Sequence, residues 1–151
     1  MNLARRLQLI KPSPTLMVTV QVAALRRQGI EVIDFGAGEP DFDTPEHIKE
    51  AAVTALKQGK TKYTPVGGTA ELKEAIVAKM QRDNGLTYSM QEVTTNCGGK
   101  HTLFNAFHAL FEAGDEVLIP APYWVSYSDM VILTGATPKL LSTTEQTGLK
   151  I

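Results

Sequence analysis

The sequence predicts an α/β fold in which short buried strands alternate with amphipathic helices. Three observations support this prediction. Apolar residues recur at helical spacing in several segments, and short runs rich in β-branched residues lie between those segments. Glycines and prolines mark the boundaries, as turns require. Since strands that alternate with helices favour βαβ units, the sheet is expected to be largely parallel.

The helices are assigned from their apolar stripes and from their end signals. The first helix is expected to end at Gly29, because glycine readily adopts the left-handed conformation of a helix C-cap. Thr69 is placed to cap the start of another helix, and Asn84-Gly85 to end it. A further amphipathic segment runs to Leu133. The three best-defined helices cover residues 45–58, 70–82 and 102–111.

The strands are expected where β-branched and other apolar residues cluster without helical spacing. Residues 1–14 are expected to form an arm rather than a packed element, because Pro12 and Pro14 favour an extended path. The predicted strands cover residues 30–35, 93–95, 116–119 and 137–142.

Composition and charge exclude several classes of protein. The 151 residues carry 15 Lys+Arg and 16 Asp+Glu, so no basic surplus indicates binding to nucleic acid or to an anionic membrane. The longest nearly uncharged stretch, residues 117–138, is interrupted by Asp129 and by prolines and predicts no membrane span. Cys97 is the sole cysteine, which rules out an internal disulfide and makes the cytoplasm the expected compartment. No metal site is predicted.

Residues 93–110 contain the most informative motif of the chain. A short β-branched run leads into Gly98-Gly99, and an apolar helix follows. The first N–H groups of a helix have no intrahelical acceptor, and the helix dipole favours an anion there. Lys100 adds a positive charge beside the turn. A phosphate is the expected ligand, although glycines between a strand and a helix also occur in ordinary βα turns.

Two common phosphate-binding motifs do not fit this turn. A nucleoside-triphosphate P-loop requires G-x-x-x-x-G-K-[ST], but Thr94 occupies the first glycine position and His101 the Ser/Thr position. A dinucleotide-binding fingerprint requires G-x-G-x-x-G, a spacing that Gly98-Gly99 lacks. The phosphate is therefore expected to belong to another kind of ligand.

Two further loops follow predicted strands and extend the candidate site. Ligands of open α/β sheets bind beyond the carboxyl ends of the strands. Residues 36–42 combine glycines with a proline, and Gly38 lets a ligand approach the bare backbone. Residues 122–124 end in Trp124, which either packs in the core or offers a flat face to an aromatic cofactor. Its place after a Pro-x-Pro run favours the second interpretation.

Four segments of the chain carry a resemblance to a known family. They span most of residues 11–135 and read AGEPDFDTPEHIKEAA, GKTKYTPVGG followed by ELKEAI, GGK-H-TLFNAF, and GDEVLIPAPYWVSY. With these segments the chain resembles the pyridoxal-phosphate-dependent aminotransferases of fold type I, class I/II, and among them the bacterial-type aspartate aminotransferases. The resemblance implies an N-terminal arm and the start of the small domain in residues 1–45. It implies an incomplete first part of the large, cofactor-binding domain in residues 46–151.

The resemblance also implies roles for individual residues. Gly98, Gly99 and Lys100 would hold the phosphate of pyridoxal 5′-phosphate at the helix N-terminus. Trp124 would stack on the pyridine ring and contact the substrate. Lys100 is in addition a candidate partner of the distal carboxylate of an acidic substrate. The alternative is that Lys100 only offsets the phosphate charge.

Two more residues and the reaction follow from the same resemblance. Gly38 would offer its backbone to the substrate α-carboxylate. Tyr63 would reach the cofactor phosphate of the other subunit of a homodimer, or else it is a strand residue packed on its own domain. The implied reaction moves an amino group between an amino acid, expected to be aspartate or another acidic one, and a 2-oxo acid. No catalytic residue is assigned within this chain, which lacks the Schiff-base lysine of the family and is expected to be inactive by itself.

Two other interpretations stay open at this point. One is a non-catalytic or split-subunit piece that binds a phosphorylated ligand. The other is a different fold type I enzyme, such as a decarboxylase or a carbon–sulfur lyase. The segments GEPDF and PYWVSY favour the aminotransferase.

Overall fold

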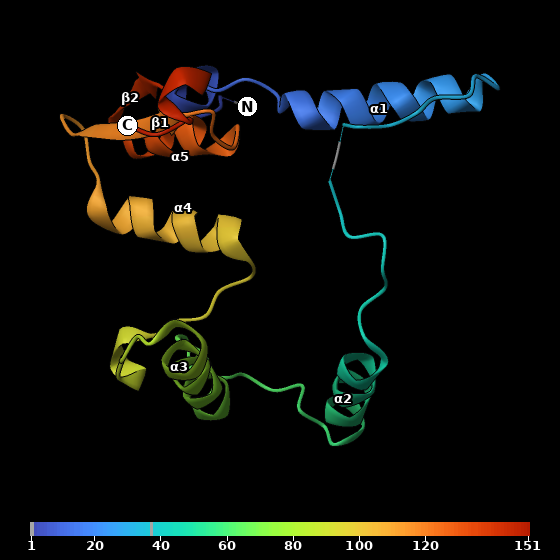
Figure 1. Ribbon diagram of the computed structural model, residues 1–151, viewed down its shortest axis with the longest axis vertical. Helices are drawn as coiled ribbons and strands as arrows, with labels where there is room; N and C mark the ends of the chain where they lie inside the picture. Colours follow the sequence, from blue (N-terminus) through green and yellow to red (C-terminus); the bar gives the residue numbers. More distant parts are fainter. Residues whose placement is uncertain (1, 37) are drawn as a thin grey trace. The chain divides into compact units, whose positions relative to one another are not determined.

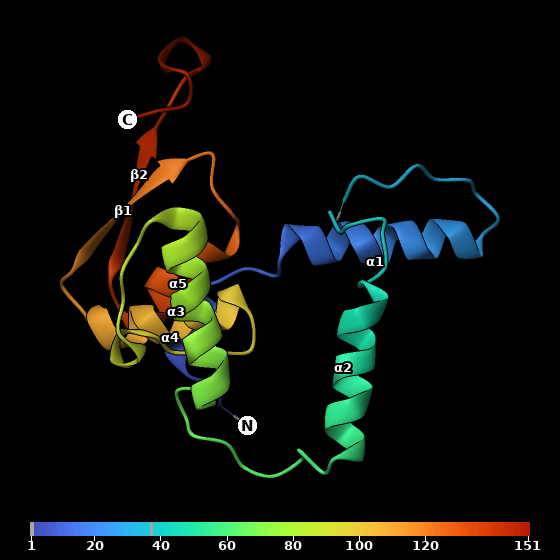
Figure 2. The same cartoon turned by 60° about the horizontal axis from the view of Figure 1, so that its bottom comes forward.

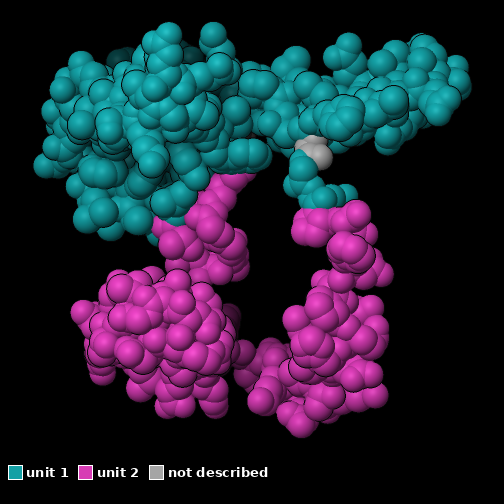
Figure 3. All heavy atoms as spheres, viewed as in Figure 1, with its two compact units in different colours: residues 1–39, 103–151 teal, residues 40–102 magenta. Residues whose placement is uncertain are grey.

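The computed structural model describes residues 2–36 and 38–151, which fall into two compact units (Figure 3). Unit 1 comprises residues 1–39 and 103–151, and unit 2 comprises residues 40–102. In the described part of the chain, no helix is both long and apolar enough to cross a membrane. In chain order the elements are η1 (Arg5–Gln8), α1 (Pro14–Arg27), α2 (Glu46–Lys57), α3 (Ala70–Asn84), η2 (Met90–Glu92), α4 (Gly99–Leu110), β1 (Glu116–Ala121), α5 (Ser126–Thr134), β2 (Thr137–Ser142) and η3 (Glu145–Thr147) (Figure 1).

In unit 1, β1, α5 and β2 form a βαβ unit (Figure 2). The two strands are parallel, with Glu116 opposite Thr137 and Ala121 opposite Ser142. The connecting helix α5 contacts both strands. The predicted strand over residues 137–142 is confirmed at both ends, and the predicted strand over 116–119 continues to Ala121.

The core of unit 1 lies between α5 and these strands. Val131 is completely buried and packs with Ile119 and Ala136. Phe107 and Phe111 pack against the same cluster, with their ring centroids 5.3 Å apart. Through Phe107, the C-terminal half of α4 packs on the βαβ unit, and such packing is stabilising because apolar burial contributes about 25 cal/mol per Å².

The N-terminal arm stays a prediction: η1 contacts α5, but all residues of η1 are exposed. The strand prediction for residues 30–35 is wrong, because these residues form no strand. They run extended beside α1, where the Arg26 guanidinium donates to the Val32 carbonyl at 3.3 Å. A strand requires a neighbour for its N–H and C=O groups, and no described segment pairs with this one.

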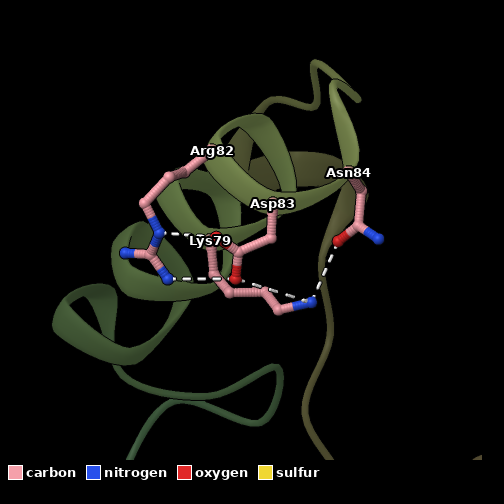
Figure 4. A network of polar contacts seen from close by, with 4 residues as sticks. All are labelled: Lys79, Arg82, Asp83 and Asn84. Atoms are coloured by element: carbon pink, nitrogen blue, oxygen red, sulfur yellow. Dashed lines mark hydrogen bonds and ion pairs between the residues drawn. The ribbon is translucent and has the colours of Figure 1, made fainter.

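Helix α3 of unit 2 begins and ends at the predicted signals. The Thr69 hydroxyl accepts the Leu72 N–H at 3.3 Å, and Gly85 takes a φ of 67° directly after the helix. The last turn carries an exposed polar network (Figure 4). Lys79 Nζ donates to Asn84 Oδ1 at 2.9 Å and Arg82 Nε pairs with Asp83 Oδ1 at 2.6 Å. Exposed pairs of this kind contribute little stability. We therefore attribute the ends of α3 to Thr69 and Gly85 rather than to this network.

Candidate functional site

The turn before α4 is the centre of the candidate site. Gly98 has a φ of 86°, in the left-handed region that favours glycine. Its carbonyl accepts both the N–H of Thr102, at 3.1 Å, and the hydroxyl of Thr102, at 3.2 Å. The helix therefore begins at Gly99, three residues before the predicted start at Thr102.

The space around the two glycines is open. A Cβ at Gly98 or at Gly99 would meet no atom within 4 Å, so a ligand can approach this backbone closely. The turn lies at the positive end of the α4 dipole, where helix N–H groups bind anions. Lys100 belongs to the same first turn. This combination suits a phosphate.

A side chain of the helix closes the loop that precedes the turn. The N–H of Cys97 donates to Nδ1 of His101 at 3.2 Å. His101 is the third residue of α4, the position from which Glu or Gln reaches back in a capping box. His101 is therefore part of the framework of the turn.

The segment that leads into the turn is not the predicted strand. Residues 93–95 pair with no strand of the described chain. Instead the Thr95 N–H donates to the Gly67 carbonyl at 3.0 Å. Gly68 has a φ of 105°, and a Cβ there would overlap the hydroxyl oxygen of Thr95. The Gly67-Gly68 loop is thus fastened to the chain just before the candidate phosphate site.

Trp124 lies in the loop between β1 and α5, in unit 1. Its side chain is 50% exposed, and its carbonyl accepts the Tyr127 N–H at 3.0 Å at the start of α5. The neighbouring Tyr123 packs against the core cluster. Within the described chain, Tyr123 is therefore the core aromatic residue of this loop and Trp124 is not.

Gly38 and Tyr63 are both exposed. A Cβ at Gly38 would meet no atom within 4 Å, so its backbone is open to a ligand. Tyr63 is fully exposed and lies in no strand. This exposure does not support the alternative that Tyr63 packs on its own domain.

Of the predicted site residues, the structure brings Gly98, Gly99 and Lys100 together in one turn. Tyr63 belongs to the same unit as this turn, whereas Gly38 and Trp124 belong to unit 1. Sequence reasoning treated His101 only as a mismatch to a P-loop and missed its bond to Cys97. The sequence carries no clear signal for this bond, because a capping box pairs a Glu or Gln at this position with the N–H of the N-cap residue, here Gly98.

Comparisons with known proteins identify the family. Residues 30–151 match the family described as aminotransferase class I and II. The chain belongs to this family. It is 52% identical to an aspartate/prephenate aminotransferase of Nitrosomonas europaea and 46% identical to an aspartate aminotransferase of Bacillus sp., and these matches cover 100% and 99% of the chain. A solved structure of aspartate aminotransferase from Thermus thermophilus with maleate is 48% identical, with a TM-score of 0.94 over 99% of the chain and 39% of that protein.

The chain spans about 38% of the length of the curated relatives it matches. The chain therefore contains only part of the α/β fold of this family, as the sequence predicts. The relatives are aminotransferases, which confirms the resemblance that the four sequence segments indicate.

The aminotransferase family depends on pyridoxal phosphate. The described residues fit the phosphate end of that cofactor. An open glycine turn, a helix N-terminus and a lysine form the donor set that a phosphate requires. Within unit 1, Phe107 of the same helix packs against the core cluster.

Proposed function

We propose that the complete protein is a pyridoxal-phosphate-dependent aminotransferase that acts on aspartate or another acidic amino acid and on a 2-oxo acid. The complete protein here means the product of the whole reading frame that contains residues 1–151. The observation that carries the proposal is the open glycine turn at the start of α4, in a chain of the aminotransferase family.

Gly98, Gly99 and Lys100 bind the phosphate in this proposal. The helix dipole and the lysine charge orient the cofactor by this end. Bound pyridoxal phosphate supplies the electron sink for amino transfer. Trp124, half exposed after β1, provides a flat apolar face for the ring and limits access of water to it. Gly38 offers its backbone N–H to the substrate α-carboxylate, for which its open surroundings leave room.

The preference for an acidic substrate has two supports. Relatives are named for aspartate, and the structure of the Thermus thermophilus aspartate aminotransferase contains maleate, a dicarboxylate. Lys100 is a mobile point charge that can serve a distal carboxylate as well as a phosphate. The Nitrosomonas europaea relative is also named for prephenate. We therefore propose prephenate as a second acceptor beside 2-oxoglutarate.

A homodimer and a cytoplasmic location complete the proposal. Tyr63 is fully exposed, as expected of a side chain that reaches the cofactor phosphate of a second subunit. The single cysteine is consistent with a reducing compartment.

The test is an assay of the complete protein with pyridoxal phosphate, aspartate and either 2-oxoglutarate or prephenate. We expect oxaloacetate together with the amino acid formed from the acceptor. Release of CO₂ or of a sulfur compound, without amino transfer, would favour a decarboxylase or a carbon–sulfur lyase. Binding of the cofactor without any reaction would favour a non-catalytic piece.

The role of Lys100 has its own test. The Lys100→Ala variant of the complete protein should lose kcat/KM for aspartate by about tenfold more than for leucine, because only aspartate carries a second carboxylate. Equal losses for both substrates would leave Lys100 as a phosphate residue only. Borohydride reduction followed by mass spectrometry adds a check, since a pyridoxyl adduct on Lys100 would contradict both assignments.

A further inference from the structure

His101 holds the backbone just before the candidate phosphate site. Its Nδ1 accepts the Cys97 N–H at 3.2 Å, one residue before the left-handed Gly98. Since Nδ1 accepts this bond, the neutral ring carries its proton on Nε2. The side chain thereby satisfies a backbone donor that precedes the helix.

The chemical nature of this acceptor matters at an anion site. A capping box places Glu or Gln at the third helical position. A carboxylate at that position would stand in the same helical turn as Lys100 and would repel a phosphate. Histidine accepts the same kind of bond without a negative charge, and Gln would do so as well.

We propose that His101 is a positioning residue for the cofactor phosphate, which it serves by holding the Cys97–Gly98 backbone open with an uncharged acceptor. The inference rests on the proposed function, because it requires a phosphate at the turn. His101 does not donate to the phosphate in this proposal. It acts by fixing the Cys97–Gly98 backbone, which leads into the first turn of α4.

Other contacts show why removing His101 should loosen the turn without unfolding the helix. Thr102 bonds to the Gly98 carbonyl through its N–H and its hydroxyl. These bonds fix the start of α4 independently of His101. The Gly98 N–H donates to the Asn96 carbonyl at 2.8 Å, which is a bond within the loop itself. The Cys97 N–H is therefore the group whose position depends on the imidazole.

The test uses the apo form of the complete protein and two probes, pyridoxal phosphate and pyridoxal, which lacks the phosphate. The variants are His101→Gln, His101→Ala and His101→Glu, and the measurement is the Kd of each probe by fluorescence quenching. We expect Ala to weaken pyridoxal phosphate binding about tenfold, the effect of one lost hydrogen bond. Gln should stay within about threefold of the unchanged protein, and Glu should bind about tenfold more weakly than Ala. Pyridoxal affinity should not change in any variant.

The matched control is His108→Ala, which removes another exposed histidine from α4, one that contacts Phe104 at 4.3 Å between ring centroids. It should leave both affinities unchanged. Equal Kd values for His101→Gln and His101→Glu would overturn the inference, as would equal losses for both probes. If His101→Ala does not fold, the Gln and Glu pair decides by itself. Failure of the unchanged protein to bind pyridoxal phosphate would instead overturn the proposed function.

Discussion

Residues 137–142 and residues 93–95 are both predicted as strands, but only the first segment forms one. β2 lies beside β1 over six residue pairs, with Leu140 opposite Ile119. Thr95, in contrast, has a backbone bond to the carbonyl of Gly67, in a loop rather than in a strand. The difference shows that the local sequence sets a preference for extended backbone, whereas a strand also needs a partner.

The same contrast holds for apolar burial. Val131 of α5 is completely buried against the βαβ unit. No apolar residue of α2 is buried in the described chain, and Ile48 and Leu56 are 50% and 64% exposed. Helix propensity and pattern are present in both helices, so the packing partner makes the difference.

The largest effect is expected from breaking the well-paired region. Val131→Asp in the complete protein would bury a carboxylate without a partner and should lower the free energy of unfolding by about 4 kcal/mol or more. Urea unfolding followed by circular dichroism measures this loss.

The matched control for this substitution is Ser126→Asp, which adds a carboxylate at the first residue of the same helix, where the dipole tolerates it. The control should change stability by less than about 0.5 kcal/mol. If the two variants lose equal stability, Val131 is not the buried centre of this unit.

A second substitution breaks the tether of the segment that forms no strand. In Gly68→Ala the new Cβ would overlap the Thr95 hydroxyl, and the residue would keep an unfavourable positive φ. We expect a loss of about 2 kcal/mol in the complete protein, together with weaker binding of pyridoxal phosphate. Gly67→Ala is the control, because its Cβ would lie at ordinary contact distances of 3.7 Å from Thr94 and 3.8 Å from Lys73. Equal effects of the two alanines would contradict the role of Gly68.

A smaller effect is expected where only local structure is involved. Thr69→Ala removes the acceptor of the Leu72 N–H and should lower the free energy of unfolding by about 1 kcal/mol. Thr69→Ser keeps the hydroxyl and should restore most of it. Amide exchange of the first turn of α3 reports the change directly, and unaltered exchange in Thr69→Ala would exclude the cap.

The smallest effect concerns pH. The backbone N–H of Ser89, and secondly its hydroxyl, bond to the Glu92 carboxylate and lower its pKa below the ordinary value of 4.5. Because the folded-state pKa is the lower one, this stabilisation is present above pH 4.5 and is lost as the pH falls through the folded-state value. NMR titration of Glu92 should show a pKa that rises in Ser89→Ala. A pKa that does not move would exclude the hydroxyl contribution.

Sequence reasoning succeeds here where the determining contacts are local. Thr69 directly precedes α3 and Gly85 directly follows it, as these two end signals predict. The bounds of β2 follow from a turn glycine and an apolar run in the same way. The tether between Thr95 and Gly67 joins residues 28 apart, and no local pattern indicates it. The packing of η1 on α5 connects segments still farther apart in sequence.

The candidate site likewise has features that the local sequence predicts and features that it does not. The Gly98-Gly99-Lys100 turn is contained in three residues and was predictable, as was its open character. The predicted start of α4 at Thr102 is three residues late, because the apolar spacing begins there whereas the first helical hydrogen bond is to the Gly98 carbonyl.

Hydrogen exchange of the complete apo-protein, with and without pyridoxal phosphate, tests the central claim most directly. If the turn before α4 binds the phosphate, peptides that contain Gly98 to His101 should gain protection when the cofactor is added. Peptides from β1 and β2, which are already paired with each other, should change much less. Protection confined to other segments, with none at the turn, would contradict the account.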